Sequence, residues 1–187
     1  ENRLNESTLD FGPQQVITTD AVWAHCVYAT DLDGDGDADV LSASMLDNKI
    51  AWYENLGCNG AVGVLFGPQQ VITLLAKEAQ FVRATDLDGD GDADVLAASL
   101  FDDKIAWYEN DGNQSFTAHD ITTNANAAAS VYAADVDGDG DLDVLSAASY
   151  DDKVSWHEMS SKKVINIDIC PGDSIFSGGA YQLFSGN

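Results

Sequence analysis

The stretch Asp31-Leu-Asp-Gly-Asp-Gly-Asp-Ala-Asp39 is the most informative part of this chain, because it occurs three times. It returns unchanged at residues 86–94, and as Asp-Val-Asp-Gly-Asp-Gly-Asp-Leu-Asp at residues 135–143. The copies begin 55 and then 49 residues apart, a spacing in the range of repeat architectures. The sequence therefore predicts three copies of one structural unit.

The similarity between the copies extends well beyond the aspartate runs. Residues 28–55 and 83–110 agree at 23 of 28 positions without a gap, and in every copy a Lys, a Trp and a Glu follow at offsets of 18, 21 and 23. Upstream, Phe11-Gly-Pro-Gln-Gln-Val-Ile-Thr18 recurs at residues 66–73 and, in weaker form, at 116–122. We expect one repeat domain over residues 1–160, with units at about 8–55, 63–110 and 114–159.

The texture within a unit is that of β-structure. Segments such as 15–18, 24–30, 40–44 and 49–54 are short, rich in Val, Ile, Tyr and Trp, and bounded by Gly, Asp and Asn, which predicts strands. Four short strands in about 50 residues is typical of a propeller blade. We expect an all-β protein of tandem four-stranded propeller-type blades. Three blades do not close a ring alone, so the array is expected to be open or part of a larger ring or assembly.

Residues 161–187 depart from the repeat. The alternation over 164–170 predicts a strand, and Pro171-Gly-Asp-Ser174 predicts a turn. We expect a linker strand here, followed from residue 178 by the start of a second β-module.

The charge of the chain excludes several classes of partner. There are 32 Asp and Glu against 8 Lys and Arg, for a formal net charge of −24. Nucleic-acid binding needs a basic surface, and so does attraction to anionic lipid. The content of 45% hydrophobic and 9% aromatic residues is enough for a folded core, and no apolar run is long enough to span a bilayer. We therefore expect neither nucleic-acid binding nor membrane insertion.

The aspartate runs predict a metal site. Carboxylates two residues apart repel one another unless a cation lies between them, and a hard ion that takes six to eight oxygens, Ca²⁺, fits best. Asp31, Asp33 and Asp35 can converge on one ion if the backbone curls, and Gly34 and Gly36 permit that curl.

Two further aspartates complete the predicted coordination. Asp39 would close the sphere from the start of the next strand, while Asp37 would offer its backbone carbonyl and point its side chain outward. An EF-hand would need a glutamate at loop position twelve, which is occupied by Ser42, Ala97 and Ser146. The EF-hand reading is therefore excluded.

Two other readings of the runs are weaker. A solvated acidic turn would explain one copy, since Asp and Gly are common turn residues, but it does not explain three. A glycosidase uses a single pair of carboxylates in unequal environments, whereas these runs are equivalent. No motif of a hydrolase nucleophile, zinc protease or phosphate loop is present, and we expect a protein that is not an enzyme.

Three parts of the unit together resemble the FG-GAP/VCBS repeat, the blade of integrin-alpha-like calcium-binding β-propellers. They are the Phe-Gly-Pro opening, the aspartate loop and the Lys-Ile-Ala-Trp-Tyr-Glu-Asn ending, over roughly residues 8–160. The resemblance implies three Ca²⁺ sites, one per repeat. The implied ligands are the five aspartates of each loop: Asp31, Asp33, Asp35, Asp37, Asp39; Asp86, Asp88, Asp90, Asp92, Asp94; and Asp135, Asp137, Asp139, Asp141, Asp143.

The resemblance also implies a secreted, extracellular or cell-surface protein. Our first hypothesis is a non-catalytic module in which Ca²⁺ rigidifies the loops and which serves adhesion or the binding of a protein or glycan. The alternative is a structural subunit of an extracellular filament or surface assembly, in which copies join through open blade edges and the C-terminal strand. A weaker alternative is an accessory domain of a secreted hydrolase or lyase.

Two remaining features of the sequence are less informative. The opening Glu1-Asn2-Arg3 shows no signal peptide, and we expect a processed or trimmed product. The odd number of cysteines (Cys26, Cys58 and Cys170) leaves open whether a disulfide forms.

Overall fold

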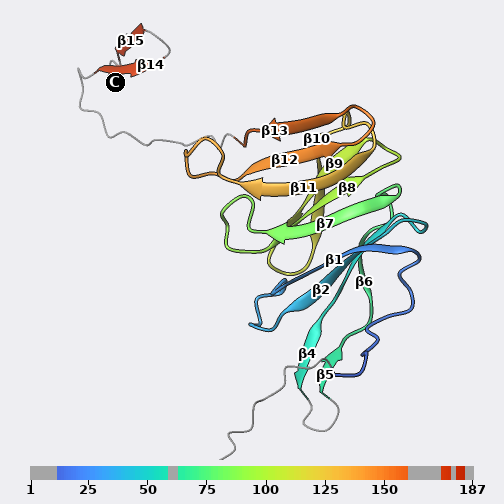
Figure 1. The fold of residues 1–187 in the computed structure, drawn as a ribbon. Helices are drawn as coiled ribbons and strands as arrows, with labels where there is room; N and C mark the ends of the chain where they lie inside the picture. The colour runs from blue at the N-terminus through green and yellow to red at the C-terminus, as the bar shows by residue number, and fades with distance from the viewer. Residues whose placement is uncertain (1–11, 59–62, 160–173, 178–179, 184–187) are drawn as a thin grey trace, which may run out of the picture.

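The computed structural model describes residues 12–58, 63–159, 174–177 and 180–183. Every regular element in these ranges is a β-strand (Figure 1), so the all-β prediction is confirmed. Within the same ranges there is no helix long and apolar enough to cross a membrane.

The first sheet has four antiparallel strands. Its order is β1-β2-β3-β6, with bounds β1 (Ala24–Thr30), β2 (Asp39–Ser44), β3 (Lys49–Tyr53) and β6 (Gln70–Thr73). The turn between β2 and β3 places Asn48 at a φ of 56°, and Asp103 and Asp152 adopt the same conformation at the equivalent turns. Asn and Asp tolerate this left-handed region better than most residues, which suits them to these tight connections.

The second sheet repeats this arrangement in the order β10-β9-β8-β7, and the third has the order β11-β12-β13. The strands of the second sheet are β7 (Ala79–Thr85), β8 (Asp94–Ser99), β9 (Lys104–Asn110) and β10 (Phe116–Thr122). Those of the third are β11 (Ala128–Ala134), β12 (Asp143–Ala148) and β13 (Lys153–His157). Three described strands make up the third sheet.

The fourth strand of each complete sheet comes from the following sequence copy. β6 lies in the segment 66–73 that opens the second copy, yet it pairs with β3, with Trp52 opposite Gln70 and Ala51 opposite Val71. β10 pairs with β9 in the same way. Each sheet therefore crosses the point at which the sequence units divide, and the crossing ties consecutive copies together.

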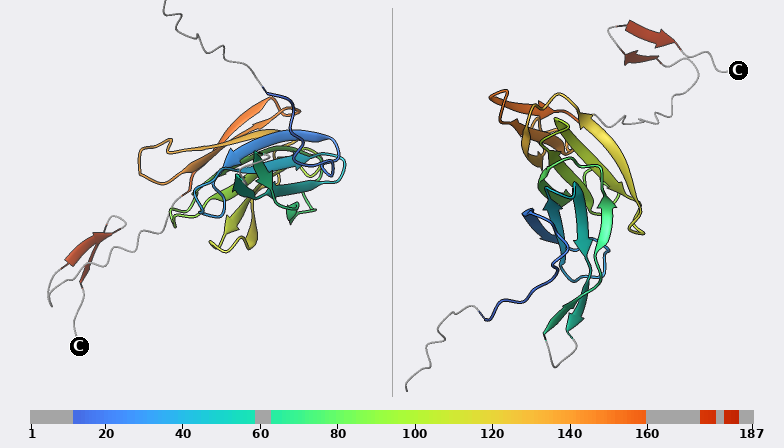
Figure 2. Two further views of the ribbon diagram at one scale, coloured as in Figure 1. Left: turned by 90° about the horizontal axis from the view of Figure 1, so that it is seen from below. Right: turned by 90° about the vertical axis from the view of Figure 1, so that its right-hand side faces the viewer.

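Two hydrophobic cores lie between neighbouring sheets, which follow one another along the molecule (Figures 1 and 2). In the first core, Leu41 and Ile50 of the first sheet pack with Val82 and Val95 of the second. The second core joins the opposite face of the second sheet to the third sheet. The second sheet is therefore covered on both faces, as expected for an internal unit of a repeat array.

Two small hairpins complete the described structure. β4 (Asn55–Cys58) pairs with β5 (Val64–Phe66), and β14 (Ser174–Ser177) pairs with β15 (Ala180–Leu183). The strand predicted over 164–170 and residues 171–173 of the predicted turn lie outside the described residues.

Candidate metal sites

Each aspartate run forms the loop between the first two strands of a sheet. The loops join β1 to β2, β7 to β8 and β11 to β12. Their two glycines all adopt positive φ, with values of 80° and 96° at Gly34 and Gly36. These are conformations that glycine adopts at little cost, so the predicted curl of the backbone is present.

Each loop brings three carboxylates together. In every group the oxygens lie within 4.8 Å of one another, and the groups are Asp31, Asp33 and Asp39; Asp86, Asp88 and Asp90; and Asp135, Asp137 and Asp143. Asp35, Asp94 and Asp139 lie outside these groups. So do Asp37, Asp92 and Asp141, whose predicted ligand is a backbone carbonyl, which a grouping of side-chain oxygens does not test.

Hydrogen bonds within the loop orient these carboxylates. The two oxygens of Asp31 accept the N–H groups of Gly34 and Gly36, at 2.8 and 3.0 Å. Asp33 accepts the Asp35 N–H at 3.2 Å, and Asp35 accepts the Asp37 N–H at 2.8 Å. Such side-chain turns are a common property of aspartate. These hydrogen bonds thus hold the loop in shape, and each carboxylate oxygen keeps a further lone pair that can bind a cation.

The ninth aspartate of each run has a second role that the sequence interpretation missed. Asp39 is fully buried, and its two oxygens accept the N–H groups of Leu32 at 2.9 Å and Asn55 at 2.8 Å. The equivalent carboxylates make the same pair of bonds, Asp94 to Leu87 and Asn110, and Asp143 to Val136 and Met159. Each one fastens its loop to the end of the third strand. The only sequence signal was the asparagine that follows the repeated Glu in two copies.

The electrostatics of the loops favour a bound cation. Burial raises the pKa of Asp33, and the neighbouring carboxylates of Asp39, Asp35 and Asp31 raise it further. Burial likewise raises the pKa of Asp88, with smaller contributions from Asp90, Glu109 and Asp86. A cation among these oxygens would favour the ionised carboxylates and so lower both pKa values. Since every side-chain donor in the groups is a carboxylate oxygen, the residues fit a hard ion such as Ca²⁺.

The surroundings of the ninth aspartate differ between the sheets. Burial raises the pKa of Asp94, which lies in the sheet with neighbours on both faces. At Asp143 the hydrogen bond from the Met159 N–H has the larger effect and lowers the pKa. The third sheet has a described neighbour on one face only, so burial raises the pKa of Asp143 less than that of Asp94.

In the first two loops, the seventh aspartate lies against a glycine that follows the third strand. A Cβ atom added to Gly112 would be 2.4 Å from Oδ2 of Asp92, and one added to Gly57 would be 3.4 Å from Oδ2 of Asp37. Both glycines have a φ of +74°. These side chains therefore point toward the segment that follows the third strand, as expected if the carbonyl rather than the carboxylate serves the ion.

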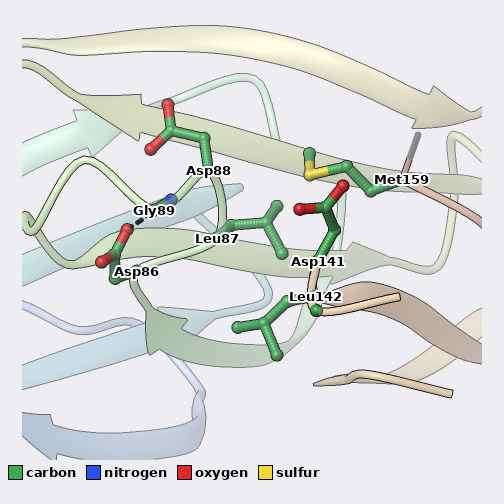
Figure 3. Close-up of a pocket in the computed structure, with 8 residues that line it drawn as sticks. Asp86, Leu87, Asp88, Gly89, Asp141, Leu142 and Met159 are labelled. Carbon is green, nitrogen blue, oxygen red and sulfur yellow. Dashed lines mark hydrogen bonds between the residues drawn. The ribbon is translucent and has the colours of Figure 1, made fainter. Parts of the chain in front are cut away.

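A hollow of about 380 Å³ separates the second and third loops (Figure 3). Asp86 and Asp88 line it from one loop, Asp141 and Leu142 from the other, and Met159 closes one side. Carboxylates and apolar side chains thus face the same space between two candidate ion sites.

The three histidines all have hydrogen-bond partners away from the loops. His25 contacts the Gln80 carbonyl at 2.8 Å, His119 the Glu109 carboxylate at 2.7 Å and His157 the Ser146 hydroxyl at 3.0 Å. None belongs to a described group that could hold a metal. Cys26 and Cys58 are free thiols, and Cys170 lies outside the described residues.

The repeats match a known protein family. A family model described as FG-GAP-like repeat matches residues 31–97 and 86–146, which together span more than half of the chain. No curated protein matches the chain.

Proposed function

The chain belongs to the FG-GAP-like repeat family, and on this basis we propose that it is a non-catalytic, extracellular module that binds one Ca²⁺ in each of its three loops. The observation that carries the proposal is the convergence of three carboxylates in every loop, with oxygens within 4.8 Å of one another. One such group is common on an acidic surface, but one in each of three equivalent loops, always with the first and third aspartates of the run, supports a shared role.

Ca²⁺ suits these loops better than Mg²⁺. Calcium accepts six to eight oxygens in flexible geometry, whereas magnesium demands a near-ideal octahedron and keeps several waters. Each run offers five aspartates on a backbone that curls through two glycines, a crowded and irregular oxygen set.

Bound Ca²⁺ would stabilise the array by removing repulsion. Of the 32 acidic residues, 15 lie in the three runs, and three ions would bring the formal charge from −24 to −18. The buried aspartate that fastens each loop to its third strand would transmit this stabilisation to the sheet. The loops would then present a rigid surface for adhesion.

The hollow between the second and third loops supports a location for a ligand. Its apolar lining by Leu87, Leu142 and Met159 lies beside the carboxylates of Asp86 and Asp88 (Figure 3). With both loops filled, a protein or glycan ligand could contact apolar side chains and polar groups near the ions together.

Calorimetric titration of the chelated protein with Ca²⁺ tests the proposal. We expect three sites, no comparable binding of Mg²⁺, and a higher unfolding temperature with Ca²⁺ than with EDTA. If Ca²⁺ is present at 100 times its dissociation constant, each site contributes about 2.7 kcal/mol.

Two variants sharpen this titration. Replacing Asp33, Asp88 and Asp137 together by Asn should abolish binding, while the control Asp20→Asn, outside the loops, should retain three sites. Equal unfolding temperatures with and without Ca²⁺ would refute the proposal.

A further inference from the structure

The far face of the third sheet, which points away from the second sheet, exposes residues whose equivalents in the other two sheets are buried or half-buried. Val154 is 84% exposed, whereas its equivalents Ile50 and Ile105 are 0% exposed. Trp156 is 47% exposed, whereas Trp52 is 2% exposed. In the first two sheets these positions are covered by the following sheet. The third sheet therefore carries the same apolar face without a described neighbour.

The near face of the first sheet, which points away from the second sheet, is exposed in the complementary way along β1, whereas Ala51 and Tyr53 on the same face are buried. Val27 is 69% exposed, while its equivalents Val82 and Val131 are each 1% exposed. Ala24 is also exposed, while its equivalent Ala79 is fully buried. The second and third sheets bury these positions against the preceding sheet. The two ends of the array thus present the two halves of one type of interface.

The third sheet lacks a described fourth strand, while the N-terminal segment contains an unpaired copy of the sequence that forms such a strand. β3 pairs with β6 and β9 pairs with β10, but among the described residues no strand pairs with the outer edge of β13. Residues 15–18, Gln-Val-Ile-Thr, are identical to β6, yet they belong to no strand. An apolar edge strand left open in this way favours the addition of another strand.

This N-terminal segment already lies beside the near face of the first sheet. Val16 and Thr18 line a hollow together with Tyr53, and β6 has the same relation to the second sheet, where the Thr73 side chain hydrogen-bonds to Tyr108. Its position therefore matches that of a strand belonging to a preceding sheet.

We propose that a second copy of this chain packs head to tail on the first, with the third sheet of one copy covering the first sheet of the other. The same placement lays residues 15–18 of the second copy along β13, in the register observed for β6. Trp156 would then face Gln15, and Ser155 would face Val16, by analogy with the observed pairs. The rigid-body movement that relates consecutive sheets, applied to a whole copy, would cover both apolar faces and pair the open edge of β13.

Backbone groups for this contact are also in place. Between the second and third sheets, the Asp103 carbonyl accepts the Ala125 N–H at 2.9 Å and its carboxylate accepts the Ala127 N–H at 3.0 Å. Asp152 is the exposed equivalent of Asp103. Trp23, the equivalent of Ala127, has a φ of 56° against 57°, a conformation uncommon for Trp. Asp152 can therefore accept the Trp23 N–H of the second copy.

The expected assembly is a closed ring of two copies. A heterologous interface produces rings when the rotation closes and filaments when it does not. Two copies supply six sheets, within the four to eight blades of closed propellers. Neither the faces nor the edge includes a residue of the calcium loops, so the proposal does not depend on the proposed function.

Sedimentation velocity in Ca²⁺ and about 0.15 M salt tests the proposal. The wild-type chain should form a dimer in a concentration-dependent manner. Val27→Asp and Val154→Asp should each weaken it at least about 100-fold, because a charge would be buried without a partner. Phe101→Asp is the matched control: Phe101 is 70% exposed, and its equivalents Leu46 and Tyr150 are exposed as well, so the dimer should persist.

Mixing the two variants identifies the geometry. Val27→Asp keeps an intact third sheet and Val154→Asp keeps an intact first sheet, so an equimolar mixture should form a complex with one native interface. Circular dichroism confirms that each variant is folded. Dimers of either variant alone would overturn the head-to-tail arrangement.

Two other results bear on the proposal. A wild-type chain that stays monomeric would overturn the docking. Longer oligomers abolished by both substitutions would support the docking but overturn closure into a ring of two.

Discussion

Aspartates within one loop perform different tasks although their sequence pattern is uniform. Asp94 is fully buried and accepts two backbone N–H groups, so it stabilises the sheet even without an ion. Asp88 lies in the cluster of carboxylates, and burial together with like charges raises its pKa. Removal of charge should therefore have opposite effects on the metal-free protein at these two positions.

The variants Asp88→Asn and Asp94→Asn separate these tasks. Asp88→Asn should remove Ca²⁺ binding at the second loop and leave the calcium-free protein equally or more stable, since repulsion is relieved. Asp94→Asn places an amide NH₂ against one buried N–H donor, so the free energy of unfolding in EDTA should fall by about 1–3 kcal/mol.

Urea unfolding in EDTA and calorimetric titration measure the two effects. In the first loop, Asp33→Asn should behave as Asp88→Asn does, whereas Asp39→Asn should lose stability in EDTA and also weaken Ca²⁺ binding, because Asp39 belongs to the carboxylate group as well. A loss of stability with Asp88→Asn in EDTA as large as that with Asp94→Asn would contradict this division of tasks.

At the scale of elements, the first two loops are fitted to the segment that follows their third strand. The seventh aspartate lies against the glycine of that segment, with a closer fit at Gly112 than at Gly57. The two glycines share a φ of +74° and differ in the space available for a side chain. They form a matched pair for testing how strongly loop and segment are coupled.

Gly57→Ala should cost about 1–2 kcal/mol, because an L-residue is strained at positive φ. Gly112→Ala should cost more, because its Cβ would lie 2.4 Å from the Asp92 carboxylate and displace that residue. Since Asp92 is a predicted carbonyl ligand, Gly112→Ala should also weaken Ca²⁺ binding at the second loop.

Urea unfolding in EDTA and calcium titration of both variants check this prediction. Equal losses of stability, with calcium binding unchanged in both variants, would show that the loop is not energetically coupled to the segment that follows the third strand.

At the scale of the whole molecule, the net charge of −24 makes stability depend on pH in opposite directions with and without calcium. The pKa values of Asp33, Asp88 and Asp94 are raised from the ordinary value of 3.8. A carboxyl with a raised pKa binds protons more readily in the folded state, so folding is favoured at low pH and this gain is lost as the pH rises through the raised values. The pKa values of Asp47 and Asp151 are lowered. The stability that these two carboxylates contribute is therefore lost only as the pH falls below 3.8.

The unfolding temperature in excess chelator should therefore fall as the pH rises above about 4. In saturating Ca²⁺ it should instead rise, because the ion competes with protons for the same oxygens. His157 works against the first trend, since burial lowers its pKa from 6.5 and acid then destabilises the fold. The scans are best made in a His157→Gln background. Parallel pH profiles with and without calcium would contradict the prediction.

The sequence by itself determined the features that depend on local spacing. Three copies, an all-β fold and three aspartate loops follow from periodicity and from the conformational freedom of Gly34 and Gly36, because each involves residues a few positions apart. The structure agrees with all three features.

Only the tertiary structure decided the features that depend on distant partners. The pairing of β6 with the preceding sheet and the exposure of Val27 and Val154 have no local signature, and the structural role of Asp94 has only the distant signal of Asn110. The sequence copies are nearly identical at these positions, so nothing within a copy distinguishes an internal sheet from a terminal one. Burial and strand pairing are set by what lies next to a residue in space, and a repeated sequence has different neighbours at its ends.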